Sequence, residues 1–107
     1  MNTRLKHVEN WAALAGKSNW SAGKLAKMCG VSLRTLQRHF QAKIGTSPKI
    51  WLSEQRQCEA RRLIVEGISV KETAWILGYR HAYNFSRGFK KQWGRSPTEP
   101  ERQNTIQ

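Results

Sequence analysis

The chain has 107 residues, enough for one compact unit or two small subdomains that share a helix, and no apolar run approaches the roughly 20 residues of a membrane span. It carries 19 Lys and Arg residues against seven Glu and no Asp, and the formal charge of +12 is typical of proteins that bind a polyanion. Its two cysteines and three histidines form no recognisable metal or catalytic motif, so we expect no enzymatic activity, no cofactor and no metal site. No signal peptide is recognisable, and we expect a cytoplasmic protein.

Helix start and stop signals predict short helices in the first half of the chain. Apolar residues recur at steps of three from position 5 to position 14 and predict an amphipathic helix that ends before Gly16. A second helix is expected over residues 21–29 and a third over residues 32–42. Each of these two begins at a Ser that can cap the helix and is followed by a Gly that can end it.

The second half carries equally clear signals. A Thr-Ser-Pro sequence places a cap before a Pro at the first helical position and predicts a long helix over residues 48–65. Capping boxes begin at Ser69 and Ser96: the first opens a helix over residues 70–77, and the second opens a final helix. A further helix is expected over residues 82–93. No strand pattern competes with this all-α interpretation.

The chain contains the same pattern of two helices and a turn twice. Ala26 and Gly30 have counterparts 48 residues later in Ala74 and Gly78, whereas from Leu36 onward the spacing is 49 residues. The second copy therefore has one extra residue, in the turn between its two helices. A small Ala one turn before a Gly lets two helices cross closely, and two copies in register predict two helix-turn-helix subdomains.

The second helix of each copy separates into an apolar stripe and a polar stripe. Each copy lies in a zone without acidic residues, from Asn10 to Ser53 and from Thr73 to Thr98. We expect the apolar stripes to face the core, and they consist of Leu36, Phe40 and Ile44 in the first copy and Phe85, Phe89 and Trp93 in the second. The polar stripes consist of Arg34, Gln37, Arg38 and Gln41 in the first copy and Tyr83, Ser86, Arg87 and Lys90 in the second.

The polar stripes have the chemistry that reads DNA. Arg pairs with guanine and Gln with adenine in the major groove, while Tyr, Ser and Lys contact bases or phosphates. Phosphates are also expected near the helix starts at Ser47 and Ser96, where free backbone N–H groups and the helix dipole favour an anion. The expected phosphate contacts are Lys43, Ser47, Lys49, Lys90, Arg95 and Ser96. Helix capping alone would also explain the two Ser-Pro pairs, and an ordinary solvated surface is the alternative for the polar stripes.

The segment SVKETAWILGYRHAYNFSRGFKKQWGRSP, preceded by EARRLI, resembles the signature of the AraC/XylS family of bacterial transcription regulators. The likeness extends from about Val8 to Arg102. It implies a fold of about seven helices, with a first helix-turn-helix subdomain over residues 1–47, a linker helix over 48–66 and a second subdomain over 67–107. It also implies that the second helix of each subdomain enters the major groove. Ala82 then joins the expected base contacts, and Arg38 and Arg87 match the base-reading arginine of the family.

The expected function is sequence-specific binding of double-stranded DNA by two recognition helices in successive major grooves. A central helix of about 18 residues at roughly 1.5 Å each spans about 27 Å, comparable to the roughly 34 Å between major-groove windows on one face of DNA. This length favours a monomer that reads an asymmetric site. The resemblance further implies activation of transcription through contact with RNA polymerase. The DNA-binding domain of a transposase or recombinase is the alternative.

Two features depart from the family pattern. Pro100 lies four residues after the cap at Ser96, where it removes an early hydrogen bond, so we expect a short final helix and a frayed tail. Most relatives also attach this module to a sensing or dimerisation domain, and none is recognisable here. We therefore expect either a free-standing regulator or a fragment of a larger one.

Overall fold

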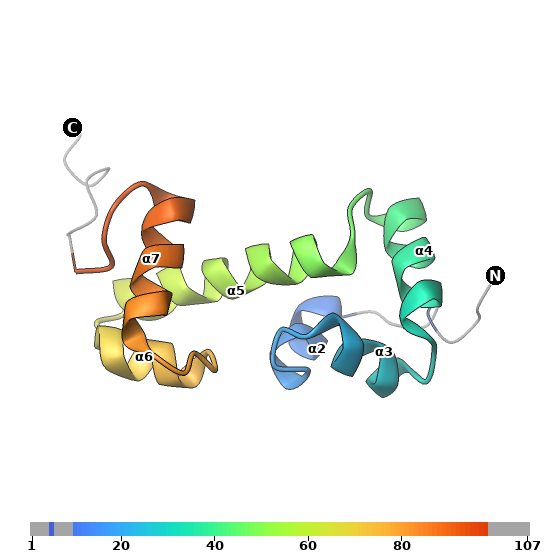
Figure 1. Ribbon diagram of the computed structural model, residues 1–107, viewed down its shortest axis with the longest axis horizontal. Coiled ribbons are helices and arrows are strands. Elements are labelled where there is room, and N and C mark those ends of the chain that lie inside the picture. Colours follow the sequence, from blue (N-terminus) through green and yellow to red (C-terminus); the bar gives the residue numbers. More distant parts are fainter. Residues whose placement is uncertain (1–4, 6–9, 99–107) are drawn as a thin grey trace. The chain divides into compact units, whose positions relative to one another are not determined.

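The computed structural model describes Leu5 and residues 10–98, which form helices joined by short turns (Figure 1). No strand occurs in this part of the chain, so the all-α prediction is confirmed. The helices with defined bounds are α2 (Trp11–Lys17), α3 (Ala22–Cys29), α4 (Leu33–Lys43), α5 (Pro48–Val65), α6 (Val70–Ile76) and α7 (Ala82–Trp93). The expected final helix and frayed tail lie outside the described residues and stay predictions.

The chain divides into two compact units, Met1–Arg56 and Gln57–Gln107. The first unit contains α2, α3, α4 and the first part of α5, and the second contains the rest of α5 with α6 and α7. Within the units α3 contacts α4, and α6 contacts α7. Each unit therefore holds one of the two predicted helix pairs together with part of the long helix.

Side-chain caps place most helix starts where the sequence predicts them. The capping oxygens are Asn10 Oδ1, Ser21 Oγ, Ser32 Oγ, Ser47 Oγ and Ser69 Oγ, which accept from the backbone N–H of the residue three positions later at 3.0 to 3.3 Å. Each such bond satisfies a donor that the first turn of a helix leaves without a partner. The predicted long helix has the observed bounds, and α6 ends at Ile76, one residue before its predicted end.

The end of α2 corrects a prediction. Gly16 was expected to follow the helix, but it lies inside α2, which continues to Lys17. The Trp20 ring packs over this position, since a Cβ built on Gly16 would lie 3.8 Å from the ring. The helix ends afterwards because Asn19 and Trp20 take positive φ angles of 55° and 61°, and a right-handed helix cannot continue through such residues.

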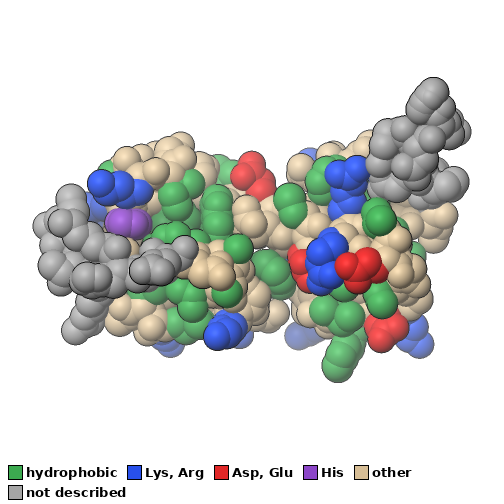
Figure 2. All heavy atoms as spheres, turned by 180° about the vertical axis from the view of Figure 1, so that it is seen from behind, with side chains coloured by type: hydrophobic (Ala, Val, Ile, Leu, Met, Phe, Trp, Pro, Cys, Tyr) green, Lys and Arg blue, Asp and Glu red, His purple; other side chains and the backbone are tan. Residues whose placement is uncertain are grey.

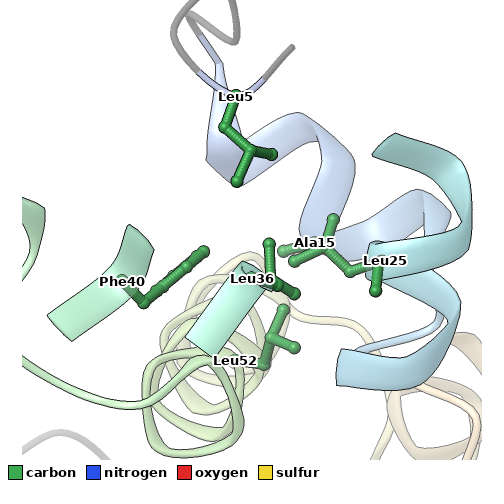
Figure 3. Close-up of a cluster of buried hydrophobic side chains, with 7 residues drawn as sticks. Leu5, Ala15, Leu25, Leu36, Phe40 and Leu52 are labelled. Carbon is green, nitrogen blue, oxygen red and sulfur yellow. The ribbon is translucent and has the colours of Figure 1, made fainter. Parts of the chain in front are cut away.

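The core of the first unit collects apolar side chains from all its helices. Figure 3 shows these side chains pointing toward one another, and the fully buried set is Leu5, Ala15, Leu25, Ala26, Leu36, Phe40 and Leu52. The Phe40 ring on α4 lies 4.9 Å from the Trp11 ring and 5.4 Å from the Trp51 ring, measured between centroids. Edge-to-face contacts of this kind hold α4 against α2 and α5.

Aromatic side chains dominate the core of the second unit. Phe85 and Phe89 on α7 are fully buried, and their ring centroids lie 5.8 Å apart. Tyr79 lies 5.4 Å from Phe85, and Trp93 lies 6.2 Å from Phe89. The Arg61 guanidinium covers the Trp93 ring at 5.1 Å, so α5 and α7 are also joined by a cation–π contact.

The apolar stripes predicted for α4 and α7 are confirmed at four positions out of six. Leu36, Phe40, Phe85 and Phe89 are fully buried, and Trp93 is half-buried. The prediction for Ile44 is wrong, because its side chain is 37% exposed. Ile44 is the C-cap of α4 and directly follows its last helical residue, Lys43, so the apolar stripe ends there with the helix.

Candidate nucleic-acid interface

The two turns between paired helices have the same hydrogen bonds. In the first unit the backbone N–H of Val31 donates to Ala26 O at 3.0 Å. In the second unit the N–H of Tyr79 donates to Ala74 O at 2.9 Å. Ala26 and Ala74 are both buried, as expected where two helices cross closely. The second turn is therefore a structural repeat of the first.

These bonds also locate the extra residue of the second copy. Val31 and Tyr79 are equivalent at a spacing of 48 residues, whereas Ser32 and His81, which directly precede α4 and α7, are equivalent at a spacing of 49. The extra residue is therefore Arg80, which is exposed next to the start of α7. The change of spacing is visible in the sequence, but Arg80 is not among the contacts that the sequence predicts.

The polar stripe of α4 forms one continuous surface. Its members line an open hollow, to which only one apolar residue contributes, and the lining residues are Arg34, Gln37, Arg38, Gln41 and Ala42. All five are exposed. The structure thus brings together all four candidates that the sequence named on this helix, and no acidic side chain lines the hollow.

The polar stripe of α7 is less uniform. Tyr83 is 69% exposed and Arg87 and Lys90 are exposed, whereas Ala82 and Ser86 are half-buried. The Arg87 guanidinium lies 5.6 Å from the centre of the Tyr83 ring, one helical turn away. This cation–π contact joins the two longest side chains of the stripe into one surface.

The candidate phosphate contacts differ in the exposure of their side chains and in the contacts that they make. Lys43, Lys49 and Lys90 are exposed. The half-buried Ser47 accepts a bond from the N–H of Ile50 at 3.2 Å, and Ser96 accepts one from the N–H of Thr98 at the same distance. Both serines thus have the capping or turn role that was the alternative reading. Arg95 is half-buried, with its guanidinium 5.9 Å from the Phe89 ring.

Histidine adds little charge to the face of α4 at neutral pH. His39 is half-buried, and its ring centroid lies 5.8 Å from that of Trp11. Burial, followed by the positive charge of Lys43, lowers the pKa of His39 below its ordinary value. The positive charge on α4 therefore comes from its Arg and Lys side chains.

None of the acidic residues in the described part belongs to α4 or α7. Glu59 and Glu66 both bind the Arg62 guanidinium, Glu66 at 2.6 Å, and this pairing raises the pKa of Arg62. Figure 2 shows acidic side chains beside Lys and Arg side chains on one face of the second unit. The positive charge of α5 is thus partly neutralised, while the described parts of α4 and α7 carry no acid at all.

Two further kinds of feature do not occur in the described part of the chain. Among them, no helix is both long enough and apolar enough to cross a membrane. No group of three or more His, Cys, Asp or Glu side chains in that part could hold a metal ion. Cys29 packs partly against the core, where burial raises the pKa of its thiol, and Cys58 is exposed.

Comparison with known proteins identifies the class to which this arrangement belongs. Residues 25–103 match a family model described as a helix-turn-helix domain, and this range includes both turns and both polar stripes. The chain therefore belongs to this helix-turn-helix family. More particularly, its relatives and solved neighbours place it with the DNA-binding domains of AraC type, which are not enzymes.

Three relatives illustrate the extent of the likeness. The transcriptional regulator RipA of Corynebacterium glutamicum is 33% identical over 78 residues, which are 73% of this chain and 24% of RipA. The transcriptional activator RhaS of Escherichia fergusonii is 32% identical over 101 residues, covering 92% of this chain and 36% of RhaS. A solved AraC-type regulator from Chromobacterium violaceum matches with a TM-score of 0.67 and 26% identity over 79% of this chain and 80% of that one. The chain thus spans about a quarter to a third of these curated relatives.

Proposed function

We propose that this domain binds double-stranded DNA with sequence specificity and serves in the regulation of bacterial transcription, in the cytoplasm. The observation that carries the proposal is the repetition of one device. Each unit has two helices joined by the same turn, and the second helix of the pair has a buried stripe that packs on the core and an opposite stripe that is polar, mostly exposed and free of acids in the described part. A helix with such a stripe suits the width of the major groove.

The recognition helices in this proposal are α4 and α7. Base contacts are assigned to Ala82 and to all members of the two polar stripes except Lys90, which gives Arg34, Gln37, Arg38, Gln41, Ala82, Tyr83, Ser86 and Arg87. The hollow on α4 supports the first four, because it places two Arg and two Gln side chains on one surface. On α7 the stacking of Arg87 on Tyr83 limits the freedom of the guanidinium, which favours a defined contact with a guanine.

Phosphate contacts are assigned to side chains at the borders of these helices. They are Lys43, Ser47, Lys49, Lys90, Arg95 and Ser96, to which we add Arg80. Arg80 is exposed and adjoins the start of α7, where the helix dipole also favours an anion. Such contacts position the protein on the duplex but do not distinguish one base pair from another.

Three further aspects follow from the proposal. A single chain carries two recognition helices of different sequence, which favours a monomer that reads an asymmetric site in successive major grooves. RhaS is named an activator, and we propose activation, with RNA polymerase as a partner, for this protein as well. The transposase alternative has no comparable support, because the relatives that match are named regulators.

The decisive experiment is the selection of binding sites from random DNA at fixed salt. We expect wild type to select an asymmetric sequence. Arg38→Ala and Arg87→Ala should each lose about 1 to 3 kcal/mol of binding free energy at that sequence, and base preference should relax in one half of the site only. Arg62→Ala is the matched control, because it removes an Arg that is already paired with Glu59 and Glu66. It should leave the selected sequence unchanged.

Two results would contradict the proposal. If wild type selects no sequence at all, the domain is not a sequence-specific DNA reader. If the Arg38 and Arg87 variants lose affinity equally for all sequences, these side chains hold the backbone and the assignment of base contacts is wrong. Circular dichroism of each variant confirms that a loss of binding is not a loss of fold.

A further inference from the structure

The start of α7 lacks a feature that every earlier described helix start has. Ser32 caps α4 by accepting a hydrogen bond from the N–H of Thr35 at 3.1 Å. The equivalent residue before α7 is His81, which makes no capping hydrogen bond with its side chain. The first turn of this proposed recognition helix is therefore not held by a cap, and other contacts must hold it in place.

Tyr79 provides such contacts. It precedes α7 by three residues, and its backbone N–H donates to Ala74 O at the end of α6. Its ring packs on Phe85 of α7 with 5.4 Å between centroids. Its hydroxyl accepts a hydrogen bond from Gln57 Nε2 on α5 at 3.3 Å. One side chain next to the start of α7 thus touches all three helical segments of the second unit.

Gln57 is an unusual residue for the place that it occupies. Its side chain is only 7% exposed, and its Oε1 has no hydrogen-bond partner within the described part of the chain. An apolar side chain of similar size would avoid the cost of burying an unpaired amide oxygen. What Gln57 adds is a directional contact, because a hydrogen bond requires a defined position of Tyr79 whereas an apolar contact tolerates sliding.

Gly88 on α7 lies beside this contact. A Cβ at position 88 would lie 3.4 Å from Gln57 Nε2 and 3.8 Å from the Tyr79 hydroxyl. Glycine inside a helix lowers helix stability relative to alanine, by roughly a few-fold in the folding equilibrium. The amide, the phenol and the backbone of α7 at Gly88 therefore lie together.

We propose that Gln57 and Tyr79 are positioning residues that set the place of the start of α7, and that they thereby sharpen base discrimination in the half of the site that α7 reads. The inference rests on the proposed function, because it assigns a role to α7 in DNA recognition. Neither residue touches DNA in this mechanism. They act through Ala82, Tyr83 and Ser86, because these residues lie in the first turns of α7 and move when its start moves.

The test is a double-mutant cycle with Gln57→Leu and Tyr79→Phe. Tyr79→Phe alone keeps the ring on Phe85 but leaves the Gln57 amide buried without its partner, so the Tm of this variant should be lower than that of wild type. The double variant replaces both partners with apolar groups of similar shape, and its Tm should recover to that of wild type or above. The cycle separates positioning from stability, because the double variant is stable but lacks the contact.

Two measurements are made on the double variant. In binding-site selection, discrimination at the base pairs read by α7 should fall roughly tenfold, about the effect of one mismatched pair. Preference in the α4 half and affinity for random DNA should not change. In hydrogen exchange without DNA, the amides of Asn84 and Phe85, which donate to His81 O, should lose protection. The Leu36 amide, the equivalent of Phe85 in the first unit, is the internal control.

The two measurements distinguish failure of this inference from failure of the proposed function. A wild type without sequence preference would contradict the proposed function, while hydrogen exchange would still decide whether the contact holds the start of α7. A folded double variant with wild-type discrimination and wild-type protection overturns the inference. If the double variant does not fold, Tyr79→Phe is measured in the same way against wild type, with the same outcomes.

Discussion

Individual residues on the same stripe of α4 differ sharply in their contribution to the fold. Phe40 is fully buried and stacks edge-to-face with Trp11 and Trp51. Ile44, one helical turn later, is 37% exposed at the end of the helix. Sequence periodicity treats the two alike, because it assumes that a helix continues. Burial, and not apolar character alone, decides which side chain stabilises the unit.

This difference predicts unequal effects of two matched substitutions. Phe40→Ala should lower the free energy of unfolding by about 3 to 5 kcal/mol, because it removes a buried ring and leaves a cavity. Ile44→Ala should cost less than about 1 kcal/mol, since much of the side chain already contacts solvent. Chemical denaturation followed by circular dichroism measures both. Equal losses would contradict the assignment of Ile44 to the surface.

At the scale of elements, the second helix pair repeats the first with two changes. Both turns use the same backbone hydrogen bonds, and Gly30 and Gly78 have φ angles of 71° and 81°, which glycine adopts without strain. The second pair inserts Arg80 and replaces the capping Ser32 by His81. The helix that follows therefore starts without a side-chain cap, which leaves its positive dipole end available to an anion but weakens the first turn.

A cap at His81 should accordingly stabilise the second unit. The backbone there has φ −133° and ψ 135°, the extended conformation that a capping residue requires. His81→Ser should raise the free energy of unfolding by about 0.5 to 1 kcal/mol, because the new hydroxyl can accept from the backbone N–H of Tyr83, or share that of Asn84 with His81 O. His81→Ala lacks an acceptor and is the control, with no gain expected. Thermal unfolding of both variants provides the measurement, and a Tm gain shared by the two would show that capping is not the cause.

The whole molecule combines a large positive charge with an uneven distribution of acids. The formal charge is +12, and the acidic side chains of the described part are confined to α5, α6 and the residue that follows α5. Arg62 on α5 is paired with two of them, whereas the described α4 and α7 carry basic side chains and no acid. A duplex bound there would release counterions from its phosphates.

Binding should therefore weaken steeply as salt is added. The five basic side chains proposed for phosphates are Arg80, Lys43, Lys49, Lys90 and Arg95, and at about 0.9 per contact they predict a log–log slope of about −4.5. Lys49→Ala should reduce the slope by about 0.9 and weaken cognate and random DNA alike. Titrations of the protein with DNA at several salt concentrations measure this slope. A slope near zero is incompatible with an electrostatic interface.

Much of the architecture could be predicted because its signals are local. The bounds of α5 and α7, the caps at Ser32 and Ser69 and the turn at Gly78 all depend on residues within about four positions of one another. The site was predicted through the repeat, since two aligned copies distinguish buried from exposed stripes without further information. The prediction was wrong for Ile44 and incomplete for Arg80, because both lie where regular helical spacing stops.

The helices, their pairing into two repeats and the polar faces of α4 and α7 are thus encoded locally in the sequence, because capping, periodicity and charge act over short distances along the chain. How each unit holds its proposed recognition helix depends on tertiary packing. In the sequence, Gln57 is an ordinary polar residue of a long helix. In the structure it is buried, and it forms a hydrogen bond with Tyr79, 22 residues away. Such contacts depend on which side chains meet when helices pack, and spacing along the chain does not encode that directly.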